Sequence, residues 1–276
     1  MSYQFLQPTT LGEATEILNS HKDVRILAGG TDLLVLLKDR AITCQYVMDV
    51  KKIPELNVFG KTANGLEIGG AVNLSKILES PLVSGAYAVL KEGALSLANS
   101  LLRNRATLIG NICNASPGGD MIPAALVLDG TLEAVSAGGS RQIPLSEFFT
   151  GARGHVLKEN ELITKITFPE KQGKGVFLKK KRIKGHDLAQ IGIAAFWAAS
   201  GELSFALGVV APTPLLLKGF GPYTQETLAK ARPDIEAEIL SKINPRSTRR
   251  SSKEYRIAMV KYFIGEIISQ WTGVSA

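Results

Sequence analysis

The chain has 276 residues, 45% hydrophobic and 21% charged, which is typical of a globular protein of about two domains. It contains no apolar run near the roughly 18 residues of a membrane span and no signal peptide at its start, so we expect a cytoplasmic protein without a membrane span. The net charge of +7 lies largely in two basic clusters with few aromatic neighbours, which argues against a nucleic-acid partner. Two separated cysteines and three scattered histidines predict no metal site.

The N-terminal part alternates helix and strand. Thr10 and Glu13 have the spacing of a capping box, and the apolar residues that follow fall on one face of a helix of about ten residues. A strand is expected at 24–28, followed by a glycine pair and an apolar segment at 33–37. A second strand at 46–50 and the residues 53–56 complete a small βαβ-like unit.

The middle and C-terminal parts predict an α+β arrangement. A strand at 65–70, helices at 73–80 and 87–100, a short β-type run ending at Gly110-Asn111, a helix at 121–128 and strands at 131–135 and 162–168 are expected in order. After a polar connection at 169–174 come strands at 176–178, 191–199 and 203–210. Helices at 225–231 and 235–243 and a last helix from Ser251, which buries Tyr255, Ala258, Met259 and Ile264, follow.

Two glycine turns carry the first functional signal. Gly29 and Gly30 can adopt positive φ and bring backbone N–H groups close to a phosphate, with a hydroxyl at Thr31 and an acid at Asp32 that can cap the next turn. By itself, this segment is more typical of a plain turn. A second turn at Gly110-Asn111, with Thr107 before it and Asp120 after it, makes a pair suited to a pyrophosphate. No Gly-x-Gly-x-x-Gly follows the first strand, so the fold is not Rossmann.

Five motifs in order resemble one family. They are Leu27 to Leu33, Asp49 to Leu56, Arg103-Asn104 with Thr107 to Asn111, Ala115 to Asp120, and Ser252 to Arg256. Together they are similar to the medium, FAD-binding subunit of the molybdenum hydroxylases, the group of xanthine dehydrogenase and aerobic carbon monoxide dehydrogenase. The resemblance implies a PCMH-type (vanillyl-alcohol-oxidase-like) FAD domain. Its two subdomains would be 1–56 and 57–170, and a C-terminal domain with a small antiparallel sheet and helices would span 171–276.

The resemblance also implies a set of cofactor-binding residues. Leu27, Ala28, Gly29, Gly30, Thr31, Asp32 and Leu33 would wrap the FAD pyrophosphate with Thr107, Ile109, Gly110 and Asn111. Asp120 would hold a polar group of FAD on the ribose, and Ile163 would pack near the flavin. Lys179 would lie near the isoalloxazine, where positive charge stabilises the reduced flavin. Ile109 departs from the family pattern, which has a glycine there, and its side chain is expected to narrow the second turn.

The implied function is electron transfer by non-covalent FAD. A large molybdenum-cofactor subunit and a small [2Fe–2S] subunit are the expected partners, in a heterotrimer that can dimerise, with electrons passing to an external acceptor. Molybdopterin and iron–sulfur clusters are expected only on those partners, since two cysteines cannot hold a cluster. The alternatives are a stand-alone PCMH-type flavin oxidoreductase and a basic polyanion-binding protein without flavin.

Overall fold

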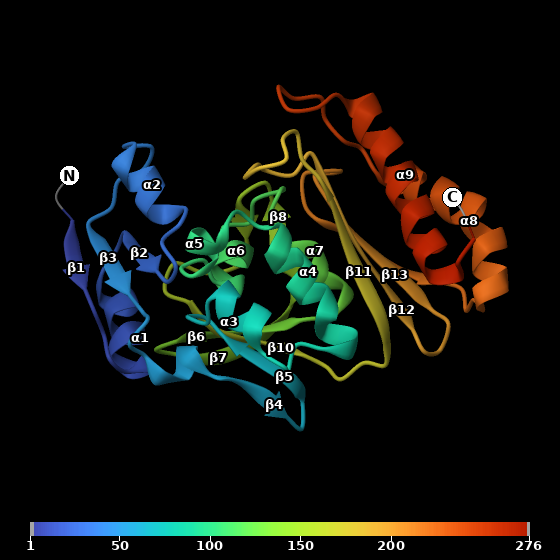
Figure 1. The fold of residues 1–276 in the computed structure, drawn as a ribbon. Helices are drawn as coiled ribbons and strands as arrows, with labels where there is room; N and C mark the ends of the chain where they lie inside the picture. Colours follow the sequence, from blue (N-terminus) through green and yellow to red (C-terminus); the bar gives the residue numbers. More distant parts are fainter. Residues whose placement is uncertain (1–2, 275–276) are drawn as a thin grey trace.

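The computed structural model describes residues 3–274. Three sheet-containing units follow one another in sequence and lie side by side from the N-terminus to the C-terminus (Figure 1). The first sheet is parallel and the next two are antiparallel, with helices packed on each, so the α+β prediction is confirmed. Within this part of the chain, no helix is both long and apolar enough to cross a bilayer.

The first unit is a parallel sheet in the order β1-β3-β2. Its elements are β1 (Gln4–Leu6), α1 (Leu11–Ser20), β2 (Val24–Leu27), α2 (Leu33–Lys38) and β3 (Tyr46–Asp49). The predicted capping box is present: the Thr10 hydroxyl accepts from the Glu13 N–H, and the Glu13 carboxylate accepts from the Thr10 N–H. Because β2 and β3 run in parallel, the glycine pair that follows β2 lies at the carboxyl edge of this sheet, where parallel sheets usually bind ligands.

The second unit is an antiparallel sheet in the order β4-β5-β10-β6-β7. Residues such as Ile68 and Ile166 of the sheet share one apolar core with Leu90 and Leu126 of the helices. The strands are β4 (Phe59–Thr62), β5 (Gly65–Gly69), β6 (Thr131–Ser136), β7 (Gly139–Pro144) and β10 (Leu162–Phe168), and β8 (Phe149–Gly151) pairs with β9 (Gly154–His155). The helices are α3 (Leu74–Glu79), α4 (Ala88–Ser96), α5 (Ser100–Arg103), α6 (Leu108–Cys113) and α7 (Met121–Val127), with short 3₁₀ turns η1 (Pro54–Asn57), η2 (Gly85–Tyr87) and η3 (Leu145–Glu147).

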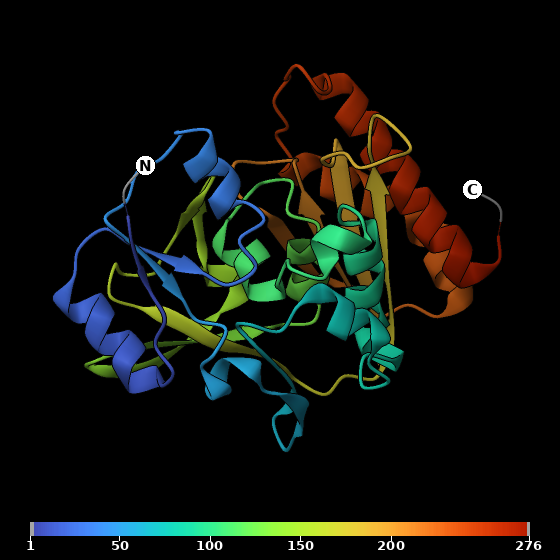
Figure 2. The ribbon, with the colours of Figure 1, turned by 60° about the vertical axis from the view of Figure 1, so that its left-hand side comes forward.

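The third unit is a sheet of β11 (Gly173–Lys180), β12 (Ile191–Ala198), β13 (Leu203–Gly208) and β14 (Leu215–Phe220), with α8 (Gln225–Lys242) and α9 (Lys253–Thr272). Along each of its strands, alternate side chains point to opposite faces of the sheet, and both faces are packed. Ala194 and Phe196 join the core of the second unit, whereas Ile193 and Ala195 join the core beneath α8 and α9. Figures 1 and 2 show the result: the sheet lies between α4 on one side and the two C-terminal helices on the other. Phe177 and its neighbours therefore fasten this sheet to the second unit.

The short run ending at Gly110-Asn111 was predicted as β-type, and this is wrong. It forms helix α6, with Thr107 as its N-cap. The buried residues Leu108, Ile109 and Ile112 have a spacing that serves a short helix as well as a strand, so six residues could not separate the two. The second glycine turn is accordingly the first turn of a helix.

The C-terminal predictions also need correction. The two helices expected on either side of Pro233 are one continuous helix, α8, because packing of Leu228, Ile235 and Ile239 outweighs the cost of the proline. Tyr255 and Ala258 of α9 are exposed, not buried, and Met259 is half-buried; Ile264 is buried as expected. Strands β1, β4, β7, β8, β9 and β14 were not predicted.

Candidate cofactor site

The segment 28–33 is a turn whose backbone donors are free. Gly30 has φ of +74°, in the left-handed region that favours glycine. Within the described chain, nothing accepts a hydrogen bond from the N–H groups of Gly29, Gly30, Thr31, Asp32 or Leu33. Successive unpaired N–H groups in such a turn form an anion-binding concavity. Asp32 stands at the N-cap of α2 but makes no side-chain cap hydrogen bond, so its predicted capping role is wrong.

Gly29 brings this turn against the second one. A Cβ at Gly29 would lie 2.2 Å from the carbonyl oxygen of Arg105 and 2.9 Å from Cα of Ala106. Only a glycine allows this approach, because both neighbours are backbone atoms that cannot rotate away. The first turn thus lies directly on the residues that lead into Thr107. Lys51 supports it from the other side, donating to the carbonyl of Ala28 at 3.3 Å and pairing with Asp49.

The second segment offers one further free donor. The Thr107 hydroxyl accepts from the N–H of Gly110 at 2.9 Å, which orders the first turn of α6. No described residue accepts from the N–H group of Ile109, whereas the N–H group of Leu108 faces the carbonyl of Val72 across the bridge between Asn73 and Thr107. Asn111 turns its side chain towards the next loop, where its Oδ1 accepts from the N–H of Met121 at 3.3 Å. The two predicted loops are therefore brought together, as the sequence indicated.

The Ile109 side chain does not face the space between the loops. It is 5% exposed and belongs to the apolar core of the second unit, which α6 enters by packing against β10. Ile163, the site residue predicted in β10, is 3% exposed in the same core. Both residues therefore contribute packing beneath the turns in this structure.

This burial makes a prediction for Ile109. We expect Ile109→Val to lower the free energy of unfolding by about 1 kcal/mol through the lost methylene, and to leave the FAD dissociation constant within about twofold. Urea unfolding and flavin titration measure the two quantities. A marked tightening of FAD binding would show instead that the side chain narrows the cofactor site.

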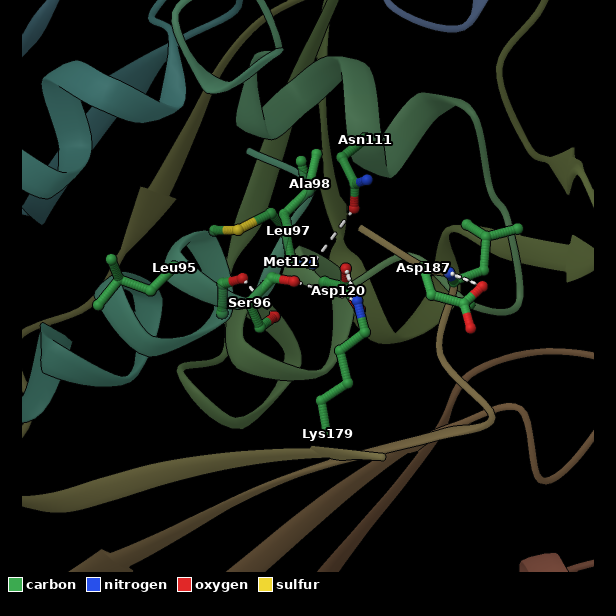
Figure 3. Close-up of polar contacts among 12 residues, drawn as sticks. Leu95, Ser96, Leu97, Ala98, Asn111, Asp120, Met121, Lys179 and Asp187 are labelled. Carbon is green, nitrogen blue, oxygen red and sulfur yellow. Dashed lines mark hydrogen bonds and ion pairs between the residues drawn. The ribbon is translucent and has the colours of Figure 1, made fainter. Parts of the chain in front are cut away.

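Asp120 and Lys179 form a buried ion pair beside the turns (Figure 3). The Lys179 ammonium lies 2.6 Å from Oδ2 of Asp120 and also donates to the carbonyl of Ser96 at 3.1 Å. Both side chains are more than nine-tenths buried, at 4% and 8% exposure. Oδ1 of Asp120 is buried and has no hydrogen-bond partner. An acceptor buried in this way needs a donor, which a hydroxyl group of a bound ligand can provide.

The electrostatics of this pair follow from its burial. Desolvation raises the pKa of Asp120 to about 6, against the opposing effect of the Lys179 ammonium and, further away, of Lys181. Lys179 is therefore neutralised by a protein carboxylate when that carboxylate is ionised. Asp120 also borders a shallow indentation with Gly118, Phe177 and Ala189, at the junction of the second and third units, which is too narrow to hold a water molecule.

The sequence missed three contributors to the site. Ser96 and the Arg105–Ala106 peptide act through their backbone, which leaves no signature in side-chain type. Lys51 lies in a motif that the resemblance includes, but its contact with Ala28 depends on the parallel pairing of β2 and β3. The glycine at position 29 was the one local signal of close backbone approach.

Comparison with known proteins identifies the family. The family model described as the FAD binding domain in molybdopterin dehydrogenase matches residues 1–171. The chain belongs to this family. The match confirms that its cofactor is FAD and that it is a subunit of an oxidoreductase. It also confirms the resemblance found in the sequence.

Relatives match this FAD-binding chain along nearly its whole length. The xanthine dehydrogenase FAD-binding subunit of Escherichia coli O157:H7 is 29% identical, over 95% of this chain and 93% of the relative. The carbon monoxide dehydrogenase medium chain of Hydrogenophaga pseudoflava is also 29% identical, over 93% and 92%. A solved structure of carbon monoxide dehydrogenase from the same organism has a TM-score of 0.87 and 26% identity, covering 96% of this chain and 95% of that chain. This agreement confirms the predicted PCMH-type fold.

Proposed function

We propose that this chain is the FAD-binding electron-transfer subunit of a molybdenum hydroxylase complex. It takes electrons from the [2Fe–2S] clusters of a small subunit and passes them through FAD to an external acceptor, while a large subunit carries the molybdenum cofactor. The complex is a cytoplasmic heterotrimer that can dimerise. The observation that carries this proposal is the set of six backbone N–H groups, in two turns held together at Gly29, that have no acceptor among the described residues.

The chemistry of these donors fits the cofactor. We assign Ala28 to Asp32 and Thr107 to Asn111 to the two phosphates of FAD, with Leu27 and Leu33 at the ends of the first turn. The free N–H groups of Gly29 to Leu33 and of Ile109 are the donors for these phosphates. The free Oδ1 of Asp120 accepts a hydrogen bond from a ribose hydroxyl. We assign Lys179 to the isoalloxazine side of the site and Ile163 to the packing beneath it.

FAD supplies an electron carrier that accepts electrons singly and releases them as a pair. The chain supplies position and charge. Its turns hold the diphosphate, and its Lys179–Asp120 pair fixes the junction between the second and third units. Lys181 lacks an ion-pair partner within the described chain and so adds positive charge at the edge of the site.

We also propose the boundaries 1–56, 57–170 and 171–276 for the two FAD subdomains and the C-terminal domain. Their support is that each of the larger sheets lies wholly within one of these ranges. The polar connection before β11 coincides with the last boundary.

Purification of the chain together with the proteins that its neighbouring genes encode tests the proposed function. We expect a complex with flavin absorption, from which heat releases unmodified FAD, and with molybdenum and iron on separate subunits. Reduction by the organic substrate should bleach the flavin only when the small subunit is present. A flavin-containing chain that turns over substrate alone would instead identify a stand-alone oxidoreductase, and a colourless protein would overturn the FAD assignment.

A further inference from the structure

Two basic segments that are distant in sequence meet at one edge of the third unit. Residues 181–190, between β11 and β12, and residues 244–254, before and at the start of α9, contain seven basic and two acidic residues. This gives a net charge of +5 in the two segments, against +7 for the whole chain. We name the seven residues the basic patch: Lys181, Arg182, Lys184, Arg246, Arg249, Arg250 and Lys253.

Specific contacts hold the two segments together. The Gln190 side chain donates to the carbonyl of Arg250 at 2.5 Å, and the Arg250 guanidinium lies 2.9 Å from Oδ1 of Asp187. Asp187 also accepts from the backbone N–H of Arg182 at 3.1 Å. The single acid of the loop is therefore used to fix the loop, and its charge is shared by two arginines.

The rest of the patch makes no ion pair within the part of the chain that the structure describes. The ion pairs of the described residues include none from Lys181, Lys184, Arg246, Arg249 or Lys253. All but Lys181 of these five are exposed. Ile183 and Leu188, which lie between the charges in sequence, are 53% and 50% exposed. Cations around exposed apolar side chains are the composition of a protein-docking surface and not of a purely solvated face.

The patch borders the proposed flavin site. Lys181 comes directly after β11, two residues beyond Lys179, and Ala189 of the same loop borders the shallow indentation beside Asp120. A protein that binds to the patch therefore lies beside the cofactor.

Resting on the proposed function, we infer that the basic patch is the docking surface for a small acidic one-electron carrier protein, which is the external acceptor. Permanent subunit interfaces are apolar and depleted in lysine, whereas unpaired surface charge favours brief encounters that are steered electrostatically. Each carrier accepts one electron, so two oxidised carriers are reduced for each reduced FAD that returns to its oxidised form, and its protons pass to water. The co-reactant is thus an oxidised haem or iron–sulfur protein of negative charge.

The test compares carriers of opposite charge on the holo-complex. Under anaerobic conditions, the reduced complex is mixed with the soluble domain of cytochrome b5, an acidic carrier, or with cytochrome c, a basic one. We expect the rate with cytochrome b5 to fall by about tenfold or more between low and physiological salt, and the rate with cytochrome c to stay flat or rise. Equal rates and equal salt dependence for the two carriers would overturn the inference.

Charge reversal assigns the effect to the patch. Lys184→Glu with Arg249→Glu changes one exposed residue of each segment, and neither side chain makes a hydrogen bond within the described chain. We expect this double variant to reduce cytochrome b5 about tenfold or more slowly than the wild type at low salt. At high salt the two rates should become equal. Lys22→Glu with Lys230→Glu, two exposed lysines outside the patch, makes the same change of net charge and should alter the rate by less than about threefold.

A binding measurement separates this inference from the proposed function. Fluorescently labelled cytochrome b5 should bind the flavin-free complex at low salt and lose affinity with the patch variant, so the readout does not need FAD. Absence of flavin with retained, patch-dependent binding would overturn the proposed function alone. Loss of the other subunits from the patch variant on gel filtration, or patch-dependent sedimentation with anionic vesicles but no cytochrome b5 binding, would overturn the docking assignment.

Discussion

Gly29→Ala is expected to abolish tight FAD binding. The new methyl group would lie 2.2 Å from the carbonyl oxygen of Arg105, a backbone atom, so the two turns must separate. Separation moves the free N–H groups of the first turn away from the N–H group of Ile109, and one diphosphate can no longer reach both turns. We expect FAD affinity to fall by about a hundredfold or more, as misplacement of positioning groups does, and the free energy of unfolding to fall by about 1–3 kcal/mol from the overpacking.

Flavin titration of the refolded or co-purified protein measures the first effect, and urea unfolding without flavin measures the second. Gly12→Ala is the matched control, because nothing lies within 4 Å of a Cβ at that position in α1. It should stabilise the helix by about 0.5–1 kcal/mol and leave flavin affinity unchanged. If Gly29→Ala binds FAD as the control does, the pyrophosphate does not lie between the two turns.

The sequence predicted those features that depend on local signals. The capping box at Thr10 and the Gly29–Gly30 turn between two apolar segments are encoded within a few neighbouring residues, and both were found where expected. The family motifs also predicted the order of the units and the residues of both turns. Comparison with known proteins then confirmed the family and its cofactor.

Other features depend on contacts that local patterns do not encode. The six residues of α6 are too few to show a helical period, and α8 passes through Pro233 because its buried face is packed along its length. The pairing of Asp120 with Lys179 joins residues 59 apart in sequence, through the packing of the third unit on the second. The sequence placed both residues near FAD but gave no reason to expect that each neutralises the other.

Removing the Lys179 ammonium is expected to destabilise the protein strongly near neutral pH. Lys179→Met keeps a long side chain in a buried position but leaves the Asp120 carboxylate without its partner. Loss of one member of a buried ion pair costs about 3–5 kcal/mol, because the remaining charge is uncompensated. We expect a loss of this size in the free energy of unfolding at pH 7. Lys180→Met, at the next position of β11, makes no ion pair within the described chain and should cost far less.

The loss should depend on pH with a definite sign. In the wild type, burial raises the pKa of Asp120 from 3.8 to about 6, so the folded state holds this proton more tightly than the unfolded state. The stability that this proton binding gives to the folded state is therefore fully present below about pH 3.8 and is lost as the pH rises through about 6. For this reason the free energy of unfolding falls by about 1 kcal/mol between pH 5 and pH 7. Without Lys179, which opposes the rise, the pKa of Asp120 moves higher still. The variant should therefore regain stability at pH 5 and lose it steeply towards pH 8.

A second substitution isolates the cause. Asp120→Asn in the Lys179→Met background removes the titrating group, so it should restore stability at pH 7 and abolish the extra pH dependence. Urea unfolding of the three proteins between pH 5 and pH 8 provides the measurement. A loss in Lys179→Met that is independent of pH, or that Asp120→Asn does not relieve, would mean that the lysine stabilises the fold through its bond to the Ser96 carbonyl. The predicted result would mean that the carboxylate beside the flavin site is kept ionised at neutral pH by one lysine from the neighbouring sheet.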